Sequence, residues 1–173
     1  EIVNGLADVL DDIETHPSRL IKLIHYIDTE LFGKKVVVFT DHIETFSKYY
    51  GVLQEAFGDE VTGFSTILDK EEAEINIFKF QSDERYKILV CDKSGGEGRN
   101  LQVADYIVHI DLPWNINTIE QRIGRLDRMG REVEIPVTSI VIHSQNSYEE
   151  QLFKFWNEGL NVFNQSLSGL EII

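Results

Sequence analysis

The chain has 173 residues, of which 42% are apolar, and a formal net charge of −14 at pH 7. Its length fits one domain with a full hydrophobic core, and 30 Asp and Glu against 16 Lys and Arg exclude a freestanding nucleic-acid binder, which needs a basic surface. The single cysteine excludes a disulfide framework and the short apolar runs exclude a membrane span and a signal peptide, so we expect a cytoplasmic protein with no membrane partner.

The first half of the chain alternates between helical and strand-like patterns. Residues 1–16 are an acidic lead-in with few apolar positions, and the start at Glu1 rather than Met leads us to expect a fragment of a longer protein. Apolar spacing then predicts a helix from residue 19 that ends before Gly33, a strand over 36–40, a helix over 41–57, a strand over 61–65 and a helix over 69–80. In the last of these helices we expect Ile75, Phe78 and Phe80 to point inward.

The second half continues the same alternation. It predicts a strand over 87–91, a Gly-rich loop over 94–101, a strand over 106–110, an arginine-rich helix, a strand over 137–143 and a helix over 148–163. The strand over 36–40 is an apolar, β-branched run with no alternation, which is typical of a strand covered on both faces. Strands that alternate with helices predict an α/β fold, in which a parallel sheet lies between two helical layers.

Polar residues gather where three of the predicted strands end. They are the clusters Thr40–His42, Ser94–Asn100, and Asp111 onward into the arginine-rich helix. Functional loops of a parallel α/β sheet lie past the carboxyl ends of its strands. We therefore expect the three clusters to converge on one edge of the sheet.

The most distinctive segment is Gln121–Arg131, which holds four arginines in eleven residues. We expect the N-cap of its helix at Asn117, with Glu120 at N3, or at Thr118, with Gln121 at N3. Three arginines then recur at every third position and lean to one flank of the helix, with Gly124 among them at a cost of roughly 1 kcal/mol relative to Ala. Guanidinium groups match phosphate oxygens in geometry and charge, so this segment predicts a phosphate-binding surface. The alternative is a solvated basic face paired with nearby acids.

Other catalytic motifs are absent from the sequence. No segment matches GxxxxGK[ST], and Gly33-Lys34-Lys35 precedes a strand and lacks the upstream glycine. Residues 83–86 (Asp-Glu-Arg-Tyr) also precede a strand, so we interpret them as a surface turn rather than an acidic ATPase box. The histidines have no metal-ligand spacing and no Gly-x-Ser-x-Gly elbow is present, so we expect neither a metal site nor a serine hydrolase.

Together these residues resemble the second, C-terminal RecA-like lobe of superfamily-2 helicases of the Swi/Snf type. Val36–His42 resembles motif IV, Ser94–Leu101 resembles motif V, and Gln121–Arg131 resembles motif VI. The run Asp-Leu-Pro-Trp-Asn at 111–115 and the segment 156–163 resemble the bacterial RapA-like, RNA polymerase-associated branch. The resemblance implies a RecA-like three-layer α/β/α fold over residues 1–173, with a helical docking segment at 147–173.

The resemblance also implies roles for individual residues. Arg128 would be the arginine finger on the γ-phosphate of ATP, with Arg125 as its partner. Coupling between nucleotide and nucleic acid would fall to Gly96, Glu97, Gly98, Asn100 and Gln121. Contacts with the backbone of one nucleic-acid strand would fall to Thr40, Ser65, Lys93 and Ser94. The implied cofactor is ATP with Mg²⁺, whose ligands would lie on a missing N-terminal RecA-like lobe, and the implied partners are that lobe, DNA bound non-specifically, and RNA polymerase or another protein complex.

Less specific interpretations stand beside these. Thr40 and Ser65 would then cap helices, residues 111–114 would form a turn with a core Trp, and Arg122 and Arg131 would be structural ion-pair partners. Trp156, Phe163, Leu152, Leu160 and Leu167 would form an apolar docking face. For the whole chain, the alternatives to a DNA translocase lobe are a catalytically idle RecA-like module that docks a partner, and a lobe of an RNA helicase.

Overall fold

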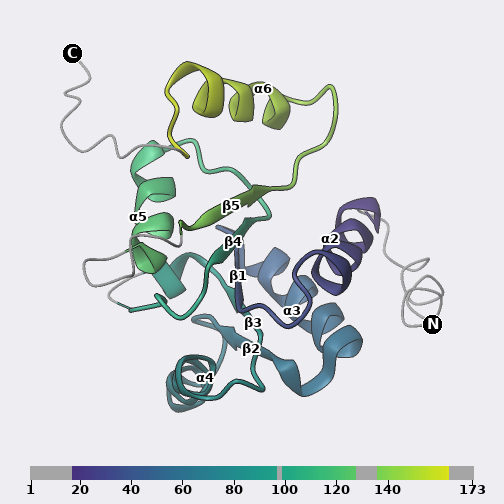
Figure 1. The fold of residues 1–173 in the computed structure, drawn as a ribbon, viewed down its shortest axis with the longest axis vertical. Coiled ribbons are helices and arrows are strands. Elements are labelled where there is room, and N and C mark those ends of the chain that lie inside the picture. The colour runs from purple at the N-terminus through teal and green to yellow at the C-terminus, as the bar shows by residue number, and fades with distance from the viewer. Residues whose placement is uncertain (1–16, 97–98, 128–135, 164–173) are drawn as a thin grey trace.

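The computed structural model describes residues 17–96, 99–127 and 136–163. A sheet of five strands forms its centre (Figure 1). The strands are β1 (Val36–Phe39), β2 (Val61–Phe64), β3 (Ile88–Cys91), β4 (Tyr106–His109) and β5 (Thr138–Val141). They lie in the order β2-β3-β1-β4-β5, and every neighbouring pair is parallel. The predicted parallel α/β sheet is therefore confirmed.

Helices cover both faces of this sheet, as Figure 1 shows. The α-helices are α2 (Pro17–Thr29), α3 (Ile43–Phe57), α4 (Lys70–Ser82), α5 (Ile116–Leu126) and α6 (Tyr148–Lys154), and the short helical turns are η1 (Gly58–Glu60), η2 (Lys93–Gly96) and the π-helical η3 (Phe155–Gly159). Helices α2 and α3 pack on one face, whereas α4 and α5 pack on the other. None of the helices in the described ranges is long and apolar enough to cross a membrane.

The central strand shows why the strand sequences do not alternate between apolar and polar residues. In β1, Val36 and Val38 belong to the core beneath α2 and α3, while Val37 and Phe39 belong to the core beneath α4 and α5. All four side chains are buried, so neither face of the strand meets water. A strand of this kind contributes side chains to two hydrophobic layers. Each large side chain that is removed from water stabilises the folded state by about 1.5–3 kcal/mol.

The inward face of α4 differs from the prediction. Phe80 is buried as expected, but Ile75 is 53% exposed and Phe78 is 67% exposed. Residues 78 and 80 are two positions apart and therefore point to nearly opposite sides of a helix. The face that packs on the sheet is formed instead by Ala73, Asn76, Ile77 and Phe80.

The ends of the last two helices also differ from the prediction. The N-cap of α5 is Asn115, whose side chain accepts a hydrogen bond from the backbone N–H of Asn117 at 3.0 Å. This cap lies two or three residues before the two predicted caps. The helix ends at Leu126, and Arg128 lies outside the described residues. The predicted helix over 148–163 is an α-helix only to Lys154, after which a π-helical turn continues to Gly159.

Candidate functional site

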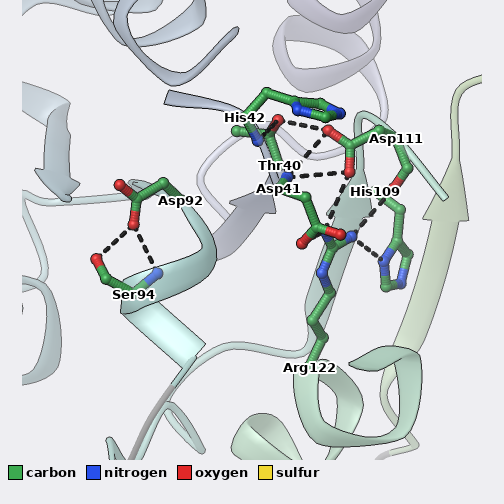
Figure 2. Close-up of polar contacts among 8 residues, drawn as sticks. All are labelled: Thr40, Asp41, His42, Asp92, Ser94, His109, Asp111 and Arg122. Atoms are coloured by element: carbon green, nitrogen blue, oxygen red, sulfur yellow. Dashed lines mark hydrogen bonds and ion pairs between the residues drawn. The ribbon is translucent and has the colours of Figure 1, made fainter. Parts of the chain in front are cut away.

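The carboxyl ends of β1 and β4 meet at one carboxylate, that of Asp111 (Figure 2). Thr40 follows β1 directly, and its buried hydroxyl donates to the Asp111 carboxylate. The backbone N–H of Asp41 lies 3.1 Å from both carboxylate oxygens of Asp111. The hydroxyl oxygen of Thr40 also accepts from the backbone N–H of His42 at 3.2 Å. Asp111 therefore fixes the turn that leads from β1 into α3.

Arg122 reaches this turn from α5. Its Nη2 donates to Asp41 Oδ1 at 2.7 Å and to Asp111 Oδ1 at 3.1 Å, and its Nη1 donates to the backbone carbonyl of Asp111 at 3.1 Å. The side chain is only 4% exposed, and its guanidinium lies over the ring of Phe39. Arg122 is thus a structural ion-pair partner, as the less specific interpretation held. The Arg122 side chain points inward, so it is not part of the phosphate-binding flank of α5 that the sequence predicted.

His109, the last residue of β4, completes this buried cluster. Its Nδ1 lies 3.3 Å from Arg122 Nη1, which can only donate, so Nδ1 accepts and the ring proton lies on Nε2. Burial and the adjoining Arg122 charge lower the pKa of His109 from 6.5 to about 3. Among the described residues, Nε2 has no hydrogen-bond partner. His109 is therefore held as a neutral ring.

This neutral ring predicts a pH dependence of stability for the chain. The unfolded state binds a proton at His109 near pH 6.5 and the folded state only near pH 3, so stability falls as the pH drops through this window. His109→Asn keeps an acceptor for Arg122 without the titration. Between pH 7 and pH 5, wild type should lose about 2 kcal/mol of unfolding free energy relative to the variant, measured by urea denaturation. A difference between the two proteins that does not change with pH would contradict the assignment.

A second carboxylate, Asp92, gathers hydroxyl groups at the end of β3. The hydroxyl of Ser65 donates to Asp92 Oδ2, and the hydroxyl of Ser94 donates to Asp92 Oδ1 (Figure 2 shows Ser94). The backbone N–H of Ser94 lies 2.8 Å from the same Oδ1. Asp92 itself is buried. Sequence reasoning did not single out Asp92 or the carboxylate of Asp111 as organising groups, although each follows a buried strand by one or two positions.

The structure brings Thr40, Ser65 and Ser94 to the carboxyl edge of the sheet, as expected from the sequence. Their hydroxyl groups donate to buried or half-buried carboxylates, and their contact with nucleic acid stays a prediction. The interpretation of Thr40 and Ser65 as helix caps is wrong, because the residue at the N-cap of α3 is His42 and that of α4 is Asp69.

The segment between β3 and β4 is tied to two helices. The backbone N–H of Leu101 donates to the carbonyl of Arg125 on α5 at 2.9 Å, and the carbonyl of Asn100 accepts from Gln81 on α4 at 2.6 Å. The Asn100 side chain bonds to Gln102. Lys93 is exposed and Gly96 closes the turn η2. The predicted residues Glu97, Gly98 and Arg128, and also Arg131, lie outside the described residues.

The outward side of α5 suits the approach of an anion. Gln121 is exposed there, and Arg125, one helical turn later, is half-buried. A Cβ at Gly124 would have no described atom within 4 Å, so a ligand can come close to the helix backbone at this point. A guanidinium beside an open stretch of helix backbone is the kind of arrangement that binds phosphate oxygens, and nucleotide binding here stays a prediction. In the part of the chain that the structure describes, no three His, Cys, Asp or Glu residues are grouped to hold a metal ion.

The two tryptophans have opposite environments. Trp114, between β4 and α5, is 78% exposed, so its interpretation as a core residue is wrong. It is an aromatic side chain at the carboxyl edge that sequence reasoning did not identify as a candidate. Trp156 is buried in a small core with Leu152 and with Ile116 and Ile119 of α5. The apolar face at these two residues of the C-terminal segment is therefore covered by this chain itself.

Comparisons with known proteins agree with this geometry. The model of the helicase conserved C-terminal domain matches residues 16–130. The RNA polymerase-associated protein RapA of Vibrio vulnificus is 35% identical over 137 residues, which are 78% of this chain but only 14% of that relative. The Sulfolobus solfataricus SWI2/SNF2 ATPase C-terminal domain superposes with a TM-score of 0.56 at 25% identity, over 87% of this chain and 57% of that one. The core of that ATPase in complex with dsDNA gives a TM-score of 0.63 at 24% identity, over 88% of this chain and 31% of that one.

Proposed function

The chain belongs to the helicase conserved C-terminal domain family, and from this premise we propose that it is the second RecA-like lobe of an ATP-dependent double-stranded DNA translocase. The observation that carries the proposal is the anchoring of α5 at the carboxyl edge. Arg122 is buried against the ends of β1 and β4, whereas Gln121 is exposed and Gly124 has open space beside it, so this side of α5 faces outward. A nucleotide would bind between this side and an N-terminal lobe.

The chemistry of such a site is electrostatic. When bound, ATP with Mg²⁺ would supply the γ-phosphoryl group that is transferred to water. Arg125 and Arg128 would donate to phosphate oxygens and stabilise negative charge there. The backbone hydrogen bond from the Leu101 N–H to the Arg125 carbonyl would keep the loop that follows β3 in a fixed position relative to α5. Gln121 would add a neutral donor or acceptor at the outer end of the same surface.

The duplex would lie along the carboxyl edge. Thr40, Ser65, Lys93 and Ser94 follow three strands of one parallel sheet and form a row along its carboxyl edge, in which Ser94 is half-buried and Thr40 and Ser65 are buried. Lys93 is the cation of this row, and it is exposed. Support for a duplex rather than a single strand comes from the likeness to a SWI2/SNF2 ATPase core that was solved with dsDNA.

This row predicts weak and non-specific DNA binding by the lobe alone. The chain's net charge of −14 repels the DNA polyanion, and the residues of this row can neutralise only a few phosphates. With about two or three neutralised phosphates, the slope of log affinity against log salt should be about −2 to −3. Titration of a labelled duplex at several salt concentrations measures this slope. Submicromolar affinity at physiological salt, or a strong preference for one sequence, would point to a dedicated recognition domain instead.

The idle docking module is less well supported. That alternative relies on the apolar face around Trp156, but Trp156 and Leu152 are packed against α5 of the same chain. Their burial leaves these side chains no direct role in capturing a partner. Through the same packing, the C-terminal segment would stabilise α5, the helix that carries Arg125.

A further inference from the structure

A pocket of about 290 Å³ lies at the amino ends of the strands, on the edge of the sheet opposite Thr40 and Asp111. Its walls come from the last turns of α2 and α3 and from residues just before β1, β2 and β3. The lining residues that are buried are all apolar, and they are Ile27, Leu31, Ala56 and Ile88. Phe32 also lines the pocket but is 78% exposed, so it extends this apolar surface to the solvent. The proposed nucleotide and DNA contacts at the carboxyl edge do not use the pocket.

The volume of the pocket limits what it can hold. Pockets for small-molecule ligands and cofactors usually have about 300–1,000 Å³, so 290 Å³ falls at the lower limit of that range. In protein–protein interfaces, by contrast, a single large side chain often enters a small pocket and supplies much of the binding energy. The pocket therefore fits one apolar anchor side chain of a protein segment better than it fits a nucleotide.

The charged groups that line the pocket are unbalanced in favour of carboxylates. Asp28 and Glu60 are exposed, and within the described ranges neither makes an ion pair. Lys87 is bound to Glu84 at 3.1 Å, so Lys34 is the lining ammonium that has no ion pair in the part of the chain that the structure describes. The pocket thus has two unpaired carboxylates against one unpaired ammonium.

The two helices that end at the pocket add partial negative charge. Helix α2 ends at Thr29 and α3 ends at Phe57, and the C-terminal end of a helix carries roughly half a negative elementary charge. Neither helix has a basic residue in its last turn to compensate this charge. The helix ends and the unpaired carboxylates therefore both favour a cation at the pocket.

We propose that this pocket is a docking site for a segment of a partner protein in which a large apolar side chain has a lysine or arginine beside it. The apolar side chain enters between α2 and α3 and covers Phe32, and the neighbouring cation lies near Asp28 and Glu60. Because the pocket is at the amino edge, the partner can remain bound while nucleotide and DNA occupy the carboxyl edge. This docking site goes beyond the proposed function and does not depend on it.

The test is an NMR titration of the ¹⁵N-labelled 173-residue chain with short capped peptides that differ only in their central residues, which are Lys-Trp-Lys, Glu-Trp-Glu or Lys-Ala-Lys. We expect Lys-Trp-Lys to bind at least about tenfold more tightly than either of the others, because it alone has both the apolar anchor and the cations. Its binding should shift the backbone amide signals of residues 27–34 and 56–60. The Lys-Ala-Lys peptide controls for the general attraction of a cation to a chain with a net charge of −14.

Variants separate the pocket from the rest of the surface. Ala56→Met fills the pocket and should weaken Lys-Trp-Lys binding by about tenfold or more. The double variant Asp28→Asn, Glu60→Gln changes only exposed side chains and should weaken it by about three- to tenfold, so the test holds even if Ala56→Met does not fold. Glu55→Gln is the matched control, since Glu55 is exposed beside Ala56 on α3 but does not line the pocket. Its affinity for the peptide should stay within about twofold of wild type.

Several results would overturn this docking site. The first is equal or tighter binding of Glu-Trp-Glu or Lys-Ala-Lys, and the second is a set of amide shifts confined to other parts of the chain. The third is an affinity for Lys-Trp-Lys that neither pocket variant changes, and the fourth is the absence of binding by all the peptides. None of these measurements involves ATP or DNA, so a failure of the proposed function would leave them unaffected.

Discussion

Replacing Arg128 with alanine in the full-length protein should reduce ATP turnover by about 10³–10⁵-fold while largely sparing ATP binding. An arginine finger acts on the transition state of phosphoryl transfer, and its removal has effects of this size. Arg128→Lys should restore little, because an ammonium lacks the bidentate fork. Steady-state turnover and nucleotide binding, measured on the same preparation, give the two quantities separately.

The matched control for this substitution is Arg85→Ala. Arg85 is 82% exposed, and it pairs with its near neighbour Asp83 and lies over the ring of Tyr86 before β3, at the amino ends of the strands. Its loss should leave turnover close to that of wild type. An Arg128→Ala protein with a rate within about tenfold of wild type would mean that the arginine segment is misassigned.

Arg122→Ala should lower the unfolding free energy of the chain by about 3–5 kcal/mol. The substitution leaves the carboxylates of Asp41 and Asp111 without their shared cation, and it removes the stacking on Phe39. Urea denaturation measures the change, again with Arg85→Ala as the control, which should stay within about 0.5 kcal/mol of wild type. A loss below about 1 kcal/mol for Arg122→Ala would contradict the buried ion-pair network.

The sheet and its functional edge could be predicted because their signals are local. Four-residue apolar runs such as Val36–Phe39 identify strands buried on both faces, and polar residues directly after them identify the carboxyl edge. Short-range patterns also located each of the α-helices α2 to α6. These features depend on neighbours along the chain, so one sequence contains enough information.

The orientation of the arginines could not be predicted in the same way. Arg122 and Arg125 are equivalent in a local pattern, and the difference between them is set by Asp41, which is 81 positions away, and by Asp111. The same limit applies to α4, where Phe78 and Phe80 compete for one inward position and only the packing on the sheet decides. Tertiary partners, rather than helical spacing, fix which side chain is buried.

The most direct test of the account is ATP hydrolysis by the full-length protein and by residues 1–173 alone, each measured without nucleic acid, with duplex DNA and with RNA. Duplex DNA should stimulate hydrolysis by the full-length protein, and RNA should do so much less. The isolated chain should show no turnover under any condition, because the phosphate loop and magnesium ligands would belong to the other lobe. Stimulation by RNA alone would indicate an RNA helicase lobe. Two results would contradict the assignment as a DNA translocase lobe. One is turnover by the isolated chain that is lost in Arg128→Ala, and the other is no stimulation of the full-length protein by any nucleic acid.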